Sequence, residues 1–394
     1  MKITVPTIDF GTSKIVTMVA QSNGERCDIG GSGAVPYSGY LQDGWNNPDE
    51  IRDVIRTAID QAQKTGNCRI HELNVGVPGM FTRVIVKEVH VSLTGPDPHV
   101  TAQDVRACFK LAEESGGDRI IHSAPAWFRV DDGKKTLSPV GIKGRELSAM
   151  IALVTADKYF IDDITYRLRD MDIEPREFYS TVAGEATYAL SQDERDKTAM
   201  LIDIGYLCTD VMVMEGDALI FHKCLDIGGG HISADIAEQL NIPFPFVEEK
   251  IKQTYSFNST NQDETYVIPA TEDEPARTVR RDEVTPIIEA KVEEIAEAIN
   301  KALEEGGVKL GKWSNVYLTG GGLILNKGGK DFLAGKLHRI IREAQRTNNK
   351  MTSHVFSSAV GLTILVVTTQ EEQKAPEGGA KGLFSRAFRW LMGY

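Results

Sequence analysis

Two stretches of the chain repeat one pattern, in which a short apolar run leads through an Asp-x-Gly turn into a second apolar run. The first turn contains Asp9 and Gly11, and the second, roughly 190 residues later, contains Asp203 and Gly205. Apolar runs of this length separated by a glycine turn predict β-hairpins. The pattern therefore predicts two hairpins of one kind, near the start and the middle of the chain.

The remaining pattern up to about residue 80 predicts more strands and one helix. Apolar runs at 27–35 and 73–77 predict strands. Between them, Asn47 and Pro48 precede a helix in which apolar residues recur at helical spacing: Ile51, Val54, Ile55, Ala58, Ile59 and Ala62. This order of strands and helix is typical of one half of a phosphate-binding domain.

Residues 82–157 are predicted to form a separate α+β insertion. Its pattern predicts a strand at 84–91, further strand material at 120–121, 127–130 and 147–154, and one helix at Thr101–Leu111. Thr101 is expected to cap that helix, with Asp104 in its first turn. His122 has no acid placed near it by spacing and is best explained as a structural histidine. A compact module without a catalytic grouping indicates an interaction surface.

The second half of the chain predicts helices joined by short strands. Two helices rich in small residues, 181–190 and 357–367, permit close helix contact and suit a hinge. Further helices are expected at 157–171, 231–240, 285–303 and 331–344, with an irregular or hairpin segment at 258–278 and a buried strand at 316–318.

The two hairpin turns carry residue types that bind a polyphosphate. Glycine turns offer backbone N–H groups, hydroxyls suit phosphate oxygens, and carboxylates hold Mg²⁺ through water. The residues concerned are Gly11, Thr12, Ser13, Lys14, Gly205 and Thr209 for phosphate and Asp9, Asp203 and Asp210 for the metal. Taken alone, each turn is better explained as a simple turn at the end of a buried strand. The repeat favours a clamp around one nucleotide.

Two further glycine clusters fit the same site. Gly320, Gly321 and Gly322 follow the strand at 316–318 and would let a sugar and base approach the backbone closely. Gly228 and Gly229 precede the helix at 231–240, where an anion can bind, although a simple helix start explains them as well. Glu249 and Lys252 lie one helical turn apart and form either a ligand contact or a surface ion pair.

Composition adds a size, a charge and a compartment. A chain of 394 residues that is 41% hydrophobic can bury two domain cores. A net charge of -12 argues against nucleic acid as a partner. The five cysteines show no metal-ligand spacing and suggest a reducing compartment. With no signal peptide and no apolar run of membrane-spanning length, the protein is expected to be cytoplasmic.

The end of the chain differs from the rest. Residues 370–382 have the composition of a flexible linker. Residues 383–394 then form an apolar and basic segment that predicts an amphipathic, interfacial membrane helix. Its membrane-facing and basic residues are Leu383, Phe384, Arg386, Phe388, Arg389, Trp390 and Leu391. A helix that docks on the protein's own core is the alternative.

The chain resembles the FtsA family of bacterial cell-division proteins, within the actin, hexokinase and heat-shock ATPase superfamily. The resemblance rests on motifs in this order: IDFGTSKIVTMVA, GYLQDGWNNPDEI, IIHSAPAWFRVDD, LSPVGIKGRELSA, LIDIG, LDIGGGHISADIAEQLNI, EEKIK, LTGGG and SSAVGL. It covers nearly the whole chain.

The resemblance implies an α/β, two-domain actin-like (ribonuclease H-like) ATPase fold with an inserted α+β subdomain of the SHS2 type. The implied domains are 1–81 with 158–198 (1A), 82–157 (1C), 199–232 with 308–368 (2A), 233–307 (2B), a linker at 369–382 and a membrane helix at 383–394. In the family, a Glu/Lys pair near Glu249 and Lys252 contacts the ribose, and the small-residue helices cross between the domains.

The resemblance also implies a function. It predicts a protein that binds ATP and Mg²⁺, polymerises on the inner membrane face at the division site and tethers FtsZ, whose C-terminal tail would bind 233–307. Arg280, Arg281 and Lys291 are the basic residues predicted to contact that tail. Other division proteins are expected to bind 82–157.

The second turn departs from the family pattern. Further glycines and a threonine usually follow its Asp-x-Gly, where this chain has Tyr206, Leu207 and Cys208. The larger side chains crowd the phosphate, and a thiol is a poor ligand for it. We therefore expect weak ATPase activity at most. A nucleotide-independent membrane adaptor, a pilus-assembly ATPase of the PilM type and a sugar or acetate kinase remain as alternatives.

Overall fold

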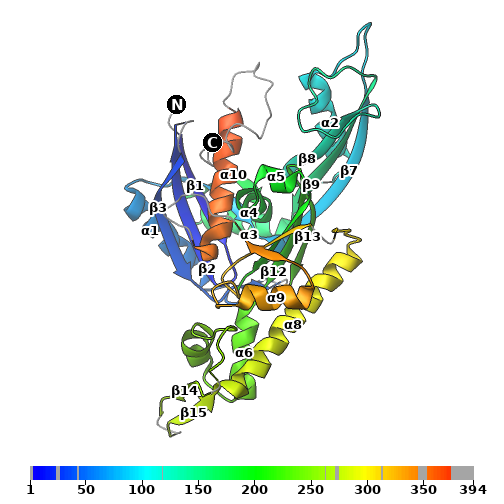
Figure 1. Cartoon of the computed structure of the whole chain (residues 1–394). Coiled ribbons are helices and arrows are strands. Elements are labelled where there is room, and N and C mark those ends of the chain that lie inside the picture. The colour runs from blue at the N-terminus through cyan, green and yellow to red at the C-terminus, as the bar shows by residue number, and fades with distance from the viewer. Residues whose placement is uncertain are drawn as a thin grey trace. The chain divides into compact units, whose positions relative to one another are not determined.

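The computed structural model describes residues 3–23, 27–41, 44–117, 119–261, 263–270, 275–311, 314–344 and 353–373. The chain divides into two compact units. Unit 1 comprises Met1–Met200, Met212–His222 and Gln345–Tyr394, and unit 2 comprises Leu201–Val211 and Lys223–Ala344. Each unit is described by itself (Figure 1).

A five-stranded sheet of order β10-β6-β1-β2-β3 forms the centre of unit 1. Its strands are β1 (Ile3–Phe10), β2 (Lys14–Ser22), β3 (Cys27–Pro36), β6 (Glu72–Val77) and β10 (Glu174–Ser180). β1 pairs antiparallel with β2 and parallel with β6, and β2 pairs antiparallel with β3. The predicted first hairpin is therefore confirmed, together with the two strands predicted after it.

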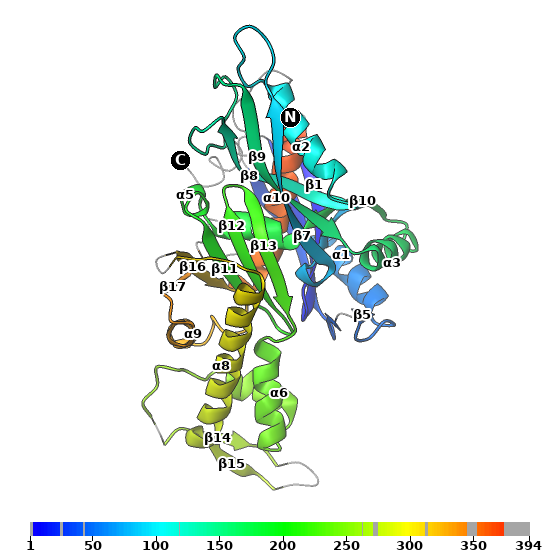
Figure 2. The ribbon, with the colours of Figure 1, turned by 90° about the vertical axis from the view of Figure 1, so that its right-hand side faces the viewer.

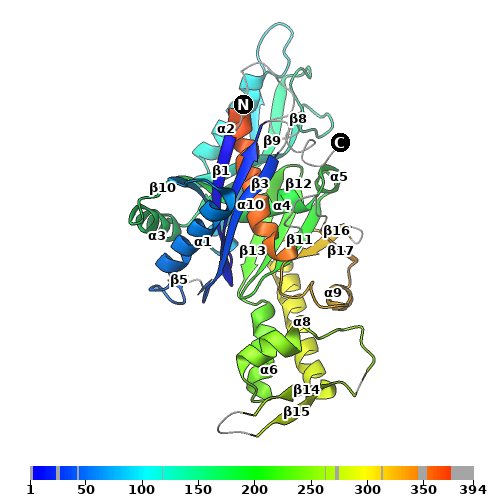
Figure 3. The ribbon, with the colours of Figure 1, turned by 90° about the vertical axis from the view of Figure 1, so that its left-hand side faces the viewer.

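Helix α1 (Ile51–Gly66) packs on β3, as Figure 3 shows. Its six buried residues are those predicted from the spacing of apolar positions: Ile51, Val54, Ile55, Ala58, Ile59 and Ala62. At Gly33 of β3 an added Cβ would overlap the Ala58 carbonyl oxygen, so only glycine allows this close approach. The short strands β4 (Tyr40–Leu41) and β5 (Gly44–Trp45) lie before this helix in the chain.

Two helices rich in small residues, α4 (Thr181–Ala189) and α10 (Ser357–Gln373), pack against one another in unit 1. A Cβ on Gly184 would lie 2.9 Å from the Gly361 carbonyl carbon, and a Cβ on Gly361 would lie 2.5 Å from Glu185 Cα. Real Cβ atoms do not come this close, so the two glycines set the distance between the helices. Helix α3 (Lys158–Arg169) and the short α5 (Gln192–Arg195) complete this part of the unit.

The predicted insertion is a three-stranded sheet of order β7-β9-β8 with one helix (Figure 2). Its elements are β7 (Thr82–Ser92), α2 (Ala102–Glu114), β8 (Ile120–Val130) and β9 (Glu146–Ala156). Thr101 and Asp104 form the capping box of α2. Burial lowers the pKa of His122 to about 4, so this side chain is neutral at pH 7, as a structural histidine would be.

The second sheet has the order β13-β12-β11-β16-β17. Its strands are β11 (Ala199–Ile204), β12 (Thr209–Glu215), β13 (Ala218–Leu225), β16 (Asn315–Thr319) and β17 (Ile341–Glu343). β11, β12 and β13 follow one another in the chain as the predicted second hairpin and its extension. β11 lies between β12 and β16, so the turn after β11 has the strand of the third glycine cluster as a neighbour.

The rest of unit 2 is mostly helical. α6 (Gly229–Gln239) and the 25-residue α8 (Arg281–Glu305) pack side by side. Between them come α7 (Phe244–Phe246), a π-helix at Val247–Lys252, and the hairpin β14 (Thr265–Ile268) and β15 (Arg277–Arg280). α9 (Gly329–Leu337) packs on α8.

Two predicted boundaries were wrong. The helix expected at 331–344 ends at Leu337, where His338 takes a left-handed backbone conformation, and the chain continues as β17. The helix expected at 357–367 continues to Gln373, with Gln370 buried, so residues 370–373 are helix and not linker.

Among the described residues, no helix is both long and apolar enough to cross a bilayer. The predicted linker from 374 onward and the predicted membrane helix at 383–394 lie outside the described residues.

Candidate functional site

The first turn, between β1 and β2 in unit 1, is closed by a hydrogen bond from the Gly11 N–H to the Lys14 carbonyl oxygen (3.0 Å). This bond leaves Thr12 and Ser13 at the tip, where both carry small hydroxyl side chains. The Tyr37 hydroxyl donates to the Gly11 carbonyl (2.7 Å), and its backbone N–H donates to the Ser13 carbonyl (3.2 Å). The turn is thus held in one shape by β3 and the segment after it.

Asp9 is the last residue but one of β1, and it is only 5% exposed. Its Oδ1 accepts a hydrogen bond from the Ser358 hydroxyl at the start of α10 (3.2 Å). Burial raises the pKa of Asp9 to about 6, although the bond from Ser358 and the charge of Lys14 act in the opposite direction. A carboxylate that is costly to ionise in this place becomes more stable when a cation approaches it.

Lys14 is the cation nearest this carboxylate in the chain order. Its Nζ lies 5.4 Å from the centroid of the Phe356 ring, within the range of a cation–π interaction. The first turn of unit 1 therefore combines an acid, two hydroxyls and a lysine, all on β1, β2 or the tip between them.

The second turn, between β11 and β12, has the same backbone closure. The Gly205 N–H donates to the Cys208 carbonyl oxygen (2.9 Å), which leaves Tyr206 and Leu207 at the tip. Both turns therefore place two residues between a glycine and its hydrogen-bonded partner.

The second turn packs on the N-terminus of α6. The Gly229 N–H donates to the Gly205 carbonyl (2.9 Å), and the Gly230 N–H donates to the Tyr206 carbonyl (2.7 Å). The Gly228 N–H donates to Nδ1 of His231 (3.0 Å). A Cβ on Gly228 would lie 2.7 Å from the Tyr206 carbonyl oxygen. The N–H groups that a bound anion would use at this helix start are committed to the turn instead.

The third glycine cluster also packs on the end of β11. The Gly322 N–H donates to the Ile204 carbonyl (2.7 Å), and an added Cβ on Gly320 would overlap Asp203 Oδ1. Gly320 has a φ of 89°, which favours glycine, and a Cβ on Gly229 would overlap Gly322. The structure brings Asp203, Gly205, Gly229, Gly320 and Gly322 together at one edge of the sheet. No described contact distinguishes Gly321.

Lys252 is buried in unit 2 and forms an ion pair with Glu248 (3.2 Å). Its Nζ also lies 5.8 Å from the centroid of the Tyr206 ring. Burial lowers the pKa of Lys252, and the charge of Glu248 acts against that change. Glu249 is exposed, because the π-helix at Val247–Lys252 alters the spacing on which a Glu249 and Lys252 pair was predicted. The partner of Lys252 in the structure is Glu248.

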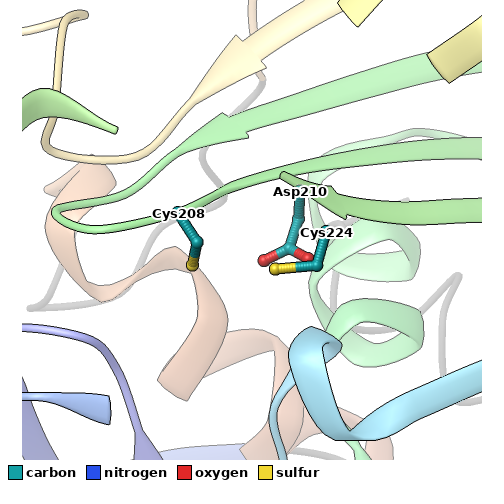
Figure 4. A group of neighbouring side chains, drawn as sticks. All are labelled: Cys208, Asp210 and Cys224. Carbon is teal, nitrogen blue, oxygen red and sulfur yellow. The ribbon is translucent and has the colours of Figure 1, made fainter. Parts of the chain in front are cut away.

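Two residues predicted to bind phosphate or metal lie at the start of β12. Thr209 is fully buried, and its hydroxyl donates to the Ile227 carbonyl (2.7 Å). Asp210 lies beside Cys224, and the Cys208 thiol completes a group whose three ligand atoms are all within 4.8 Å of one another (Figure 4). The hydrogen bond to Cys208 and burial raise the pKa of the Cys224 thiol well above its usual value. Spacing along the sequence did not reveal this cluster.

The three basic residues predicted to contact a partner differ in their surroundings. Arg281 is 3% exposed, pairs with Glu264 (2.9 Å) and lies over the Tyr255 ring, so its prediction as a surface contact was wrong. Lys291 is paired with Asp235 and Glu294. Arg280 is exposed and pairs with Asp282. The residues predicted to contact a membrane lie outside the described part of the chain.

Several residues that shape these turns were not predicted. Ser358 was visible only as part of a small-residue helix, and Tyr37 only as one aromatic after a strand. Cys224 gave no metal-binding signal in the sequence, because the nearest cysteine, Cys208, is 16 positions away along the chain. The usable signal is that both cysteines lie at the ends of neighbouring predicted strands.

Two family models match this chain. The model described as "Cell division protein FtsA" matches residues 200–361, and the model described as "SHS2 domain inserted in FTSA" matches residues 79–155. A protein of Pseudomonas aeruginosa described as "Cell division protein FtsA" is 24% identical over 98% of this chain and 97% of its own length.

Solved structures support the fold. The structure of a "PilM-PilN type IV pilus biogenesis complex" has a TM-score of 0.62 at 17% identity, over 93% of this chain and 99% of the other. MreB5 of Spiroplasma citri bound to AMPPNP has a TM-score of 0.56 at 11% identity, over 94% of this chain and 98% of the other. The chain therefore has the actin-like fold with an SHS2 insertion, as predicted.

Proposed function

Because the chain belongs to the FtsA family of cell-division proteins, we propose that it binds ATP with Mg²⁺, forms filaments and tethers the FtsZ ring to the inner face of the membrane. The observation that carries the nucleotide part is the edge of the second sheet, where Asp203 and the Gly320 cluster meet. In α/β sheets, ligands bind beyond the strand ends, where turns rich in glycine lie next to one another.

The carboxylates of the two turns are of a type that holds a hydrated magnesium ion. Mg²⁺ prefers oxygen ligands and keeps several of its waters, so carboxylates hold it directly or through water. Asp9 and Asp203 are the residues proposed to do this, and Thr12, Ser13, Lys14 and the glycine turns would bind phosphate oxygens. The ion would supply positive charge against the phosphates. The backbone N–H groups of five of the glycines and the Thr209 hydroxyl are already bonded inside the fold, so they contribute less than the sequence suggested. These glycines are Gly11, Gly205, Gly228, Gly229 and Gly322.

The proposed hydrolysis is slow at most. Tyr206, Leu207 and Cys208 occupy the second turn, where the family pattern usually has further glycines and a threonine. Bound nucleotide would then act by stabilising the conformation of the chain that is able to polymerise.

Titration calorimetry tests the nucleotide proposal. ATP with Mg²⁺ is titrated into the full chain, into Asp203→Ala and into Asp60→Ala, an exposed acid on α1 that serves as the control. Heat from the full chain and from Asp60→Ala, lost in Asp203→Ala, supports ATP binding at this edge. Absence of heat from the folded full chain would remove ATP from the proposal and leave a nucleotide-independent membrane adaptor.

The membrane part rests on the sequence of residues 383–394. An amphipathic helix with arginines and a tryptophan binds reversibly to anionic lipid, and several copies in a filament would hold more firmly. We expect the full chain to co-sediment with anionic vesicles and Phe388→Glu to remain in solution. Glu377→Gln, in the predicted linker, is the control. Equal sedimentation of the three proteins would argue against this anchor.

The FtsZ part concerns residues 233–307. Of the three basic residues considered, Arg280 is exposed, whereas Arg281 supports the fold. An FtsZ C-terminal tail peptide is expected to bind the full chain, with weaker binding to Arg280→Ala than to Arg69→Ala. Binding of a pilus-assembly peptide in place of the FtsZ tail would favour the PilM-type alternative. The insertion at 82–157 is proposed to bind other division proteins.

A further inference from the structure

Three side chains at the end of the β12 and β13 hairpin form a group of a kind that binds metal. Cys208 closes the second turn, Asp210 is the second residue of β12, and Cys224 is the last residue but one of β13. Figure 4 shows all three on the same side of the ribbon, with Asp210 next to Cys224. All three belong to unit 2.

The distances match the size of a metal-binding site. The two sulfur atoms and a carboxylate oxygen lie within 4.8 Å of one another. A tetrahedral Zn²⁺ with Zn–S bonds of about 2.3 Å holds its sulfurs roughly 3.8 Å apart. Side-chain rotations that move each donor atom by less than about 1 Å would therefore place all three donors on one ion. A backbone hydrogen bond already fixes the Cys208 end of the group, since the Gly205 N–H donates to the Cys208 carbonyl.

The donor set selects the metal. The two soft thiolates favour Zn²⁺ over the hard ion Mg²⁺, and Zn²⁺ also accepts a carboxylate oxygen as a ligand. We propose that Cys208, Asp210 and Cys224 bind one zinc ion, with a water in the fourth position. On binding, each thiol loses its proton to solvent, so two protons are released for each ion.

Such an ion would join the second turn to β13. Cys208 belongs to the turn and Cys224 to the strand, so one ion ties the hairpin at the end where the family pattern is lost. This would hold the turn in its packed position on α6 whether or not a nucleotide is bound. Cys208, which stands where the family pattern usually has a threonine, would then serve as a metal ligand. The inference is independent of ATP binding, because the proposed magnesium ligands are Asp9 and Asp203 and not Asp210.

Cobalt substitution tests the site. The full chain is purified under reducing conditions, stripped of metal and titrated with Co²⁺, whose tetrahedral thiolate complexes absorb in the near ultraviolet and the visible. The same titration is made with Cys208→Ser, Cys224→Ser and Cys68→Ser, the last being a half-buried cysteine of unit 1. Zn²⁺ and Mg²⁺ are then added in competition.

The proposal expects one Co²⁺ per chain with a thiolate spectrum in the full chain and in Cys68→Ser, displaced by Zn²⁺ and not by Mg²⁺. Loss of one thiol should weaken binding by about 100-fold or more, because even the loss of a residue that only orients a ligand costs 10- to 100-fold. Circular dichroism verifies that each variant is folded. Should a serine variant not fold, Asp210→Asn takes its place, with weaker binding and an altered visible spectrum expected.

Three results would overturn the site. One is a folded, reduced full chain that shows no thiolate spectrum with Co²⁺. Another is a spectrum that persists unchanged in both serine variants. The third is displacement by Mg²⁺ at equal concentration, which would show that oxygen ligands alone hold the ion.

Discussion

The turn at Asp9–Lys14 and the turn at Asp203–Cys208 share a backbone and differ in what fills it. Each has a glycine N–H bonded to the carbonyl three residues later. The first has Thr12 and Ser13 at its tip, and the second has Tyr206 and Leu207. The same backbone therefore supports two kinds of surface, one with small hydroxyls and one with large side chains.

The surroundings of the two turns differ in the same way. A Cβ on Gly11 would only approach the Lys14 carbonyl oxygen, at 3.1 Å. At the second turn, Gly228, Gly229, Gly320 and Gly322 all lie where a Cβ would overlap or closely approach other backbone atoms. The second turn is therefore packed closely against neighbouring backbone, whereas the first turn has only one such close approach, within the turn itself. The Asp-x-Gly pattern alone did not separate these roles.

The largest expected effect breaks the second turn. Gly320→Ala should lower the free energy of unfolding by about 3 to 5 kcal/mol, because the new methyl group overlaps Asp203 and Ile204 at a φ of 89°. Urea denaturation measures this. Gly335→Ala, a helical glycine with nothing within 4 Å of its added Cβ, is the matched control and should change stability by less than about 1 kcal/mol. Equal effects would contradict the close packing.

The next prediction concerns the buried acid of the first turn. Its raised pKa means that the folded chain binds a proton more tightly than the unfolded chain, so stability falls as pH rises from about 4 to 6. Asp9→Asn removes the buried charge and should stabilise the chain by roughly 2 to 3 kcal/mol at pH 8. Below about pH 4 the two proteins should unfold at the same denaturant concentration. A gain that does not depend on pH would contradict the ionisation of Asp9.

Replacement of Tyr206 by glycine makes the second turn more similar to the family pattern. Tyr206→Gly removes the ring that lies near Lys252, and it should tighten ATP binding by about tenfold, or 1.4 kcal/mol, if crowding limits the site. Calorimetry with Mg²⁺ measures the affinity, with Tyr166→Gly on the exposed face of α3 as the control. Unchanged or weaker affinity in Tyr206→Gly would show that the ring does not occupy the space of the ligand.

The smallest effect distinguishes the two glutamates near Lys252. Glu248→Gln removes the partner of a buried ammonium and should cost about 1 kcal/mol, because both side chains of the pair are mostly shielded from water. Glu249→Gln, one residue along and exposed, should cost nothing measurable. The reverse order in thermal denaturation would restore the pairing predicted from helical spacing.

Much of the fold was predictable because it depends on local pattern. Alternation and helical spacing identified the two hairpins, α1 with all six of its buried residues, and the insertion around α2. These features need only the period of apolar positions and a capping residue, which neighbours along the chain supply. Where the chain changed element within a polar stretch, as at β17, that local signal was lost.

The sequence by itself determined the family, the two hairpins and the residues placed at each turn. Only the tertiary structure decided which of them meet. It placed Cys208 near Cys224, buried Arg281 against the Tyr255 ring, and paired Lys252 with Glu248. The physical reason is that a contact between side chains depends on strand order, helix type and packing distance, which are properties of the whole folded chain and not of the spacing between two residues.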